Sequence, residues 1–165
     1  MSDVTVSVGT KLIVWAAKGA PKMLKKVAAK YVPFQFENVA ITIQPHPTIN
    51  HNKAESICEL RLSLSLRNAT TYDLKLLTGQ VELEISGYVF TSLSLPKIVI
   101  LPVGKESTVY LTRPLTEFEY ARAQKLFGSR DKQDCRCTLS LQCETAFGQQ
   151  DYERRVSTSI DLLQS

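Results

Sequence analysis

The stretch Leu60-Arg61-Leu62-Ser63-Leu64-Ser65-Leu66-Arg67 alternates leucine with a polar residue through four consecutive repeats. Because successive side chains of a β-strand point to opposite faces, this pattern predicts a strand with one leucine face and one polar face. Such strands are typical of antiparallel sheets that pack on one side and meet water on the other. The stretch therefore favours a fold built from packed sheets.

The same period of two recurs on both sides of this stretch. We expect Gly79 to separate two strands, and Pro45 and Pro47 to keep residues 44–56 a loop, because proline cannot donate to a sheet ladder. The expected strands cover residues 34–43, 57–67, 72–78, 81–85, 88–90, 97–100, 106–111, 135–146 and 152–162. Regular turn signals between them predict an all-β fold, an immunoglobulin- or fibronectin-III-like antiparallel β-sandwich.

One short helix is expected within this sandwich, at about residues 115–127. Thr116 and Glu119 have the spacing of a capping box, and Leu115 and Tyr120 have that of a hydrophobic staple. Gly128 is placed to end the helix.

The positive charge of the chain is concentrated near its start. The net charge is +4, yet the segment from Lys11 to Tyr31 holds six lysines and no acidic residue. Residues 20–31 have apolar residues on one helical face and lysines on the other, so we expect a basic amphipathic arm over residues 1–32 and the sandwich over 33–165. The residues expected to bind a partner or a membrane are Trp15, Lys18, Lys22, Lys25, Lys26, Lys30 and Tyr31.

The arm has two interpretations. It is either an interfacial helix on anionic lipid or an acidic protein, or a helix packed on its own domain with a solvated lysine face. A basic segment confined to one arm argues against nucleic acid as a partner. No apolar stretch approaches the ~20 residues that span a bilayer, and residues 1–10 lack the charge pattern of a secretory signal. We expect a cytoplasmic protein, either free or peripheral on a membrane.

The cysteines and histidines give little sign of chemistry. Cys58 shares the parity of Leu60, while Cys135, Cys137 and Cys143 share that of Leu139, so all four should be reduced and face the core. The Cys-x-Cys spacing differs from that of zinc sites. The two histidines, His46 and His51, flank a predicted loop and are expected to be solvated or capping groups. We therefore expect no metal, no cofactor, no small-molecule substrate and no enzymatic activity.

The middle of the chain resembles a known family. The similarity is carried by residues 60–67, Asn68-Ala69-Thr70, Tyr72-Asp73-Leu74, residues 79–83, Ile85-Ser86-Gly87 and residues 101–107. In these the chain is similar to the water-stress and hypersensitive-response (WHy) domain of the group-two late embryogenesis abundant proteins. The resemblance implies a β-sandwich with a helix and a non-enzymatic protective or binding role in stress, with no catalytic residues to transfer.

Two functions remain open from the sequence. The first is a protective module that binds other proteins or membrane surfaces weakly through polar faces. The second is a structural subunit of a larger assembly, such as a virion, a filament or an organelle complex, whose arm docks on a neighbour or on a second copy.

Overall fold

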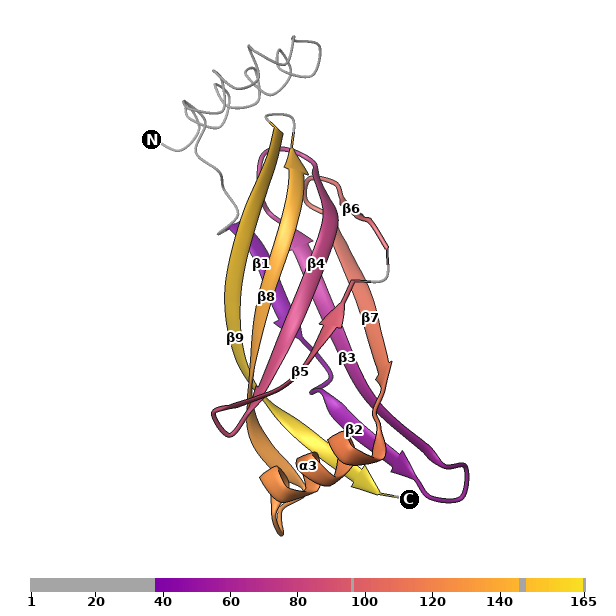
Figure 1. Ribbon diagram of the computed structural model, residues 1–165. Coiled ribbons are helices and arrows are strands. Elements are labelled where there is room, and N and C mark those ends of the chain that lie inside the picture. The colour runs from indigo at the N-terminus through magenta and orange to yellow at the C-terminus, as the bar shows by residue number, and fades with distance from the viewer. Residues whose placement is uncertain (1–37, 96, 146–147, 165) are drawn as a thin grey trace.

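The computed structural model describes residues 38–95, 97–145 and 148–164 of the 165-residue chain. These residues form strands and one short helix, shown in Figure 1. The elements are β1 (Val39–Ile43), β2 (Thr48–Asn52), β3 (Ile57–Asn68), β4 (Leu74–Ile85), β5 (Tyr88–Ser94), β6 (Val99–Leu101), β7 (Glu106–Pro114), α3 (Glu117–Phe127), β8 (Lys132–Thr145) and β9 (Gly148–Gln164).

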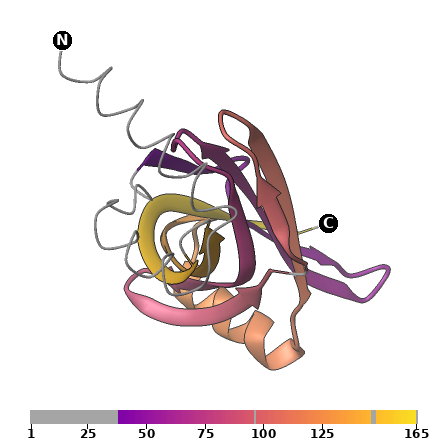
Figure 2. The same ribbon diagram turned by 90° about the horizontal axis from the view of Figure 1, so that it is seen from above.

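The strands belong to one mixed sheet that folds over on itself. Its order is β1-β3-β2-β9-β8-β4-β5, with β7 on the other side of β3 and β6 beside β4. One layer holds β7, β3, β1 and β2, and the other holds β9, β8, β4, β5 and β6. Figure 2 shows the strands wrapping around a common interior. The prediction of an all-β sandwich-like fold with one short helix is confirmed.

The two layers are joined by a parallel pairing. β2 runs parallel to β9, with Thr48 opposite Asp161 and His51 opposite Gln164, while the other strand pairs are antiparallel. The expectation of a wholly antiparallel sandwich was therefore wrong at this pair. The parallel partner of β2 lies more than a hundred residues away along the chain, so the sequence around β2 does not predict this pairing.

The alternating stretch supplies the centre of the core. Leu60, Leu62, Leu64 and Leu66 are at most 3% exposed, and the neighbouring arginines face outward. The same alternation buries Val81, Leu83 and Ile85 on β4 and Leu139 and Leu141 on β8. Burying these side chains, at about 25 cal/mol per Å² of apolar surface, is the main force that joins the layers.

Two differences from the sequence-based expectation concern whole strands. The predicted loop 44–56 contains β2, whose apolar residue Ile49 is fully buried. Gly79 does not divide two strands, because β4 runs through it without interruption. A Cβ atom at this position would lie 2.7 Å from Cδ2 of Leu141, so glycine is used here for a close approach rather than for a break.

The predicted helix is present as α3. The side chain of Thr116 accepts a hydrogen bond from the Glu119 amide, and the Glu119 side chain accepts one from the Thr116 amide. Gly128 is the C-cap. Figure 1 shows α3 at the end of the molecule where the C-terminus lies. Among the helical residues that the structure describes, none form a span long and apolar enough to cross a membrane.

Candidate functional site

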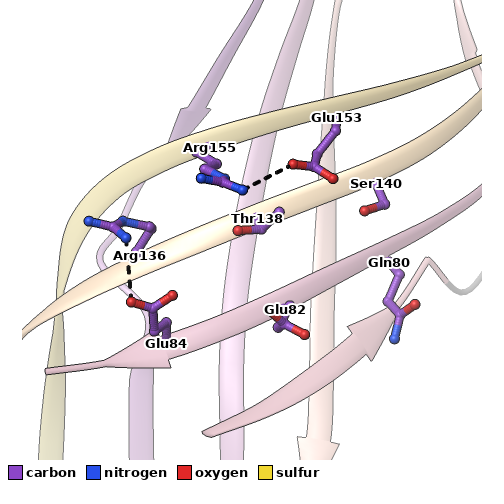
Figure 3. A pocket seen from close by; sticks show the side chains of 8 residues that line it. All are labelled: Gln80, Glu82, Glu84, Arg136, Thr138, Ser140, Glu153 and Arg155. Carbon is purple, nitrogen blue, oxygen red and sulfur yellow. Dashed lines mark hydrogen bonds and ion pairs between the residues drawn. The ribbon is translucent and has the colours of Figure 1, made fainter. Parts of the chain in front are cut away.

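The outward surface of β4, β8 and β9 carries a cluster of polar side chains around a hollow of about 330 Å³. We call this surface the polar face, and Figure 3 shows its side chains. It consists of Gln80, Glu82 and Glu84 from β4, Arg136, Thr138 and Ser140 from β8, and Glu153 and Arg155 from β9.

The strand register arranges these side chains in rows that cross the sheet. Gln80 lies opposite Ser140, which lies opposite Glu153; in the next row Glu82 lies opposite Thr138, which lies opposite Arg155. Directly opposed side chains in a sheet are about 5 Å apart at Cβ, so each row is a chain of neighbours. The inward residues between them build the core, and the polar face is thus a product of the alternation that folds the domain.

Ion pairs connect part of this grid. Nη1 of Arg136 lies 3.4 Å from Oε1 of Glu84 across the two strands, and Nη2 of Arg155 lies 3.5 Å from Oε1 of Glu153 along β9. Glu82 forms no ion pair within the residues that the structure describes. The Arg155 and Glu153 side chains are 69% and 58% exposed, and such pairs add little to stability. The polar face therefore carries nearly balanced charge at the surface and contributes little to holding the fold together.

The chemistry open to this face is reversible hydrogen bonding and charge pairing. Guanidinium groups offer donors in a planar fork, carboxylates only accept, and the Thr138 and Ser140 hydroxyls do both. A partner that presents mixed charges or amides can exchange with the existing ion pairs at small cost, because the pairs are already solvated. In residues 38–95, 97–145 and 148–164, no group of three or more His, Cys, Asp or Glu side chains is placed to hold a metal ion.

The cysteines follow the predicted parity. Cys135, Cys137 and Cys143 are buried, Cys58 is half-buried, and all four are free thiols. Sγ of Cys135 lies 3.9 Å from Sγ of Cys137 in the core. This contact and burial raise the pKa of Cys135 above its ordinary value, and burial together with the nearby Asp151 carboxylate raises the pKa of Cys143 to about 12.

Cys58 is also a poor nucleophile. Burial and the carboxylates of Glu119 and Glu59 raise the pKa of its thiol. A reactive cysteine needs a lowered pKa, so the surroundings of Cys58 work against thiolate chemistry.

The two histidines do not share a site. Nδ1 of His46 lies 3.1 Å from Oγ1 of Thr158 on the exterior, in accord with a solvated group. His51, expected at the edge of a loop, instead belongs to β2, and its ring centroid lies 4.1 Å from that of Tyr120 on α3. Its Nδ1 is buried and has no hydrogen-bond partner among the described residues. The prediction for His51 was wrong because β2 was predicted as a loop. As part of this strand, His51 is turned toward the core side of the sheet.

The residues predicted to bind a partner through the arm lie outside the described residues. They are Trp15, Lys18, Lys22, Lys25, Lys26, Lys30 and Tyr31. The division into an arm and a sandwich likewise falls on this part of the chain and stays a prediction.

Most of the polar face could not be found by sequence reasoning. The sequence shows Glu82 and Glu84 as carboxylates on the outward face of one strand, where such groups usually keep a sheet soluble. The outward parity of Arg136 and Arg155 was visible as well, but nothing in the sequence states which residue of β8 lies opposite which residue of β4. The cross-strand register, which is a long-range property, is what gathers these side chains into one surface.

Comparisons with known proteins show which fold the chain resembles, but they assign it to no family. No family model matches the chain, and no curated protein matches it. Among solved structures, a putative late embryogenesis abundant protein is similar with 13% identity and a TM-score of 0.51, over 98% of this chain and 90% of that chain. A structural-genomics target is similar with 6% identity and a TM-score of 0.50, over 76% of this chain and 87% of that one. At these identities the likeness concerns the fold alone, and that fold is one that a late embryogenesis abundant protein also adopts.

Proposed function

We propose that this protein is a non-enzymatic binding module that protects other macromolecules during water loss or similar stress. The observation that carries the proposal is the polar face, a broad surface with three carboxylates, two guanidinium groups and little net charge. The sequence resemblance to WHy domains and the likeness in fold to a late embryogenesis abundant protein support the same function.

The polar face suits weak and general binding. Its ion pairs lie at the surface, with side chains between 24% and 69% exposed, so a partner does not have to displace a buried network. When water is scarce, the exposed carboxylates, guanidinium groups and hydroxyls can replace water at the polar surface of a client protein. This mode of binding requires neither a deep pocket nor an activated nucleophile.

A drying experiment tests the proposal. Lactate dehydrogenase, a client enzyme sensitive to drying, is dried and rehydrated with the full chain, and its residual activity is measured. We expect the wild type to preserve activity and a variant with Glu82→Ala, Glu84→Ala, Arg136→Ala and Arg155→Ala to lose most of this effect. The four changes leave the net charge unaltered, since they remove two acids and two bases.

The matched control lies on the other layer. Arg67 and Glu106 are opposite each other on β3 and β7, both are exposed, and replacing both with alanine is also neutral in charge. This control should protect as the wild type does. Equal protection by the polar-face variant and the wild type would contradict the proposal.

A second candidate function, a structural subunit of an assembly, is favoured by the outer edge of β9, most of which pairs with no strand among the described residues. On the side away from β8, β9 pairs with β2 only from Asp161 to Gln164. N-terminal to Asp161, this edge of β9 has no strand partner among the described residues. There, Nη1 of Arg154 donates a hydrogen bond of 2.8 Å to the carbonyl of Val39 on β1. Unpaired edges can accept a strand from another chain.

Light scattering separates the two functions. The solution mass of the full chain is compared with that of a chain that starts at Val32. Self-association that disappears on shortening would favour the subunit, with the arm as its docking element. A monomeric full chain would favour the protective module.

The arm itself is proposed to bind an anionic membrane surface or a protein partner. Replacing Lys22, Lys25, Lys26 and Lys30 with glutamine is expected to abolish binding to vesicles that contain phosphatidylserine, because each lysine near such a surface contributes about 1 kcal/mol. The fold, measured by circular dichroism, should not change. Unaltered vesicle binding would rule out the lipid interpretation.

A further inference from the structure

A second surface hollow lies on the other layer and shares no lining residue with the polar face. It has a volume of about 270 Å³ and lies over β2, β3 and β7 beside the turn that follows β1. Its polar and aromatic side chains are those of His46, Thr48, Arg61, Ser63, Tyr110 and Thr112, and we call it the tyrosine hollow.

The register shows how the tyrosine hollow is built. Thr48, Arg61 and Thr112 form one row across β2, β3 and β7, and Ser63 and Tyr110 form the next. The Tyr110 side chain is 74% exposed, whereas Ser63 is only 6% exposed at the floor. An exposed aromatic ring thus stands beside a floor and a rim that carry hydroxyl groups.

The charge of the hollow is compensated. The guanidinium group of Arg61 forms an ion pair with the Glu59 carboxylate, and Nδ1 of His46 lies within hydrogen-bond distance of Thr158. An anionic ligand would have to compete with Glu59 for Arg61. The N–H donors of Arg61 that the pair leaves free can still bind a neutral hydroxyl group, since a guanidinium group carries five.

The exposed apolar surface of the hollow comes from Pro45 and from the ring of Tyr110, since Leu62 and Leu111 line it but are each 3% exposed. A purely apolar ligand would cover the hydroxyl groups of the rim without bonding to them, which costs free energy. Among the described residues that line the hollow, Tyr110 is the one phenol ring, whereas grooves that bind proline-rich peptides are lined by several aromatic rings. A ligand that combines a flat C–H face with many hydroxyl groups matches both the exposed apolar surface and the polar rim.

We propose that the tyrosine hollow binds a neutral saccharide. A pyranose ring of the glucose type has a C–H face that can stack on Tyr110, while its hydroxyl groups exchange hydrogen bonds with Arg61, Thr48 and Thr112. Aromatic rings favour contact with a partially positive C–H edge because their own faces are electron-rich. The site differs from the polar face in position and chemistry, so it neither requires nor restates the protective function.

The test is a titration of the isotope-labelled full chain with maltohexaose and with cellohexaose, followed by the backbone amide shifts in NMR. We expect saturable shifts centred on Ser63, Tyr110 and Thr112 with at least one of the two oligosaccharides. Tyr110→Ala should weaken binding at least tenfold, and Tyr110→Phe should preserve it, because stacking needs the ring and not the hydroxyl group.

Tyr88→Ala is the matched control. Tyr88 is 64% exposed, lies at the start of β5 and does not line the hollow, so its removal should leave binding unchanged. The proposal would be overturned by the absence of saturable shifts with both oligosaccharides, or by equal affinity of wild type and Tyr110→Ala. It would also be overturned if dextran sulfate bound at these residues while neither neutral oligosaccharide did.

Discussion

Asn68 ends β3 in a position that makes its side chain part of the fold. It is fully buried, and its Nδ2 donates to the carbonyls of Tyr72 at 2.9 Å and Leu101 at 2.7 Å. Its Oδ1 accepts from the Thr70 amide at 2.9 Å and from the Thr70 hydroxyl at 2.6 Å. The tripeptide Asn68-Ala69-Thr70, which matches a glycosylation acceptor, is thus a structural turn whose amide is fully occupied.

Asn68→Asp is expected to lower the free energy of unfolding by about 3 kcal/mol at neutral pH. The change keeps the shape but removes both N–H donors and leaves two buried carbonyls facing a carboxylate. The free energy is measured by urea unfolding. Ala69→Ser, at the exposed neighbouring position, should change it by less than about 0.5 kcal/mol, and similar values for the two variants would contradict the assigned role.

The thiols should react in an order set by their burial. In the native protein at about pH 8, none should react at the rate of a free thiol, and Cys58 should be modified first, since it is half-buried while the other three are buried. The pKa of Cys143, raised to about 12 by burial and Asp151, makes its thiolate rare under these conditions. Mass spectrometry after brief treatment with iodoacetamide gives the order, and early modification of Cys143 would be inconsistent with its surroundings.

At the scale of elements, one glutamate holds α3 in place by bonding to both its N-cap residue and a neighbouring strand. Glu119 completes the capping box with Thr116, and its Oε1 also lies 2.7 Å from Nη2 of Arg113 on β7. On the next turn of the helix, Nη2 of Arg122 donates to the carbonyl of Val89 on β5 at 2.7 Å. The helix therefore connects β5 with β7, each of which pairs with one strand among the described residues.

This arrangement predicts a pH-dependent stability. The hydrogen bond from the Thr116 amide, followed by those from Arg113 and the Thr116 hydroxyl, holds the pKa of Glu119 below its ordinary value of 4.5. Because the folded pKa is the lower one, the stabilisation is fully present above the ordinary pKa and is lost as the pH falls through the folded pKa. The difference in unfolding free energy between wild type and Glu119→Gln should therefore shrink from about pH 7 to about pH 3. A difference that is constant or that grows in acid would contradict this account.

The contribution of the N-cap residue to the free energy of unfolding can be measured by itself. Thr116→Ala removes the acceptor for the Glu119 amide and should cost about 1 kcal/mol of stability. Thr112→Ala, an exposed threonine on β7, serves as the control for urea unfolding and should have a smaller effect. Equal losses would show that the cap contributes nothing specific.

Some elements could be predicted from the residues within and beside them, and others could not. β3, β7 and α3 were predictable because alternation, parity and capping are encoded within a few residues of each element. β2 was not, because its five residues have one fully buried apolar side chain and depend on β3 and β9 for their hydrogen bonds. The unbroken course of β4 through Gly79 was hidden for a similar reason, since glycine is needed there because the side chains of Leu95 and Leu141, both outside β4, approach closely.

At the scale of the whole molecule, the mixed sheet presents two chemically different outer surfaces. The polar face on β4, β8 and β9 is lined with charged groups, while the tyrosine hollow on β2, β3 and β7 combines hydroxyl groups with one exposed ring. The residue types of both surfaces were visible in the sequence, but their grouping depends on the pairing of strands distant along the chain. The central claim is that clients of this protein contact the polar face.

Carboxyl footprinting tests this claim most directly. The full chain is treated with a carbodiimide and an amine, with and without partially unfolded lactate dehydrogenase, and modification of each carboxyl group is quantified by mass spectrometry. The account predicts that modification of Glu82 and Glu153 falls when the client is present, while that of Glu55 and Glu117, exposed elsewhere, does not change. Unchanged modification of Glu82 and Glu153, or protection centred on Glu55 and Glu117, would contradict it.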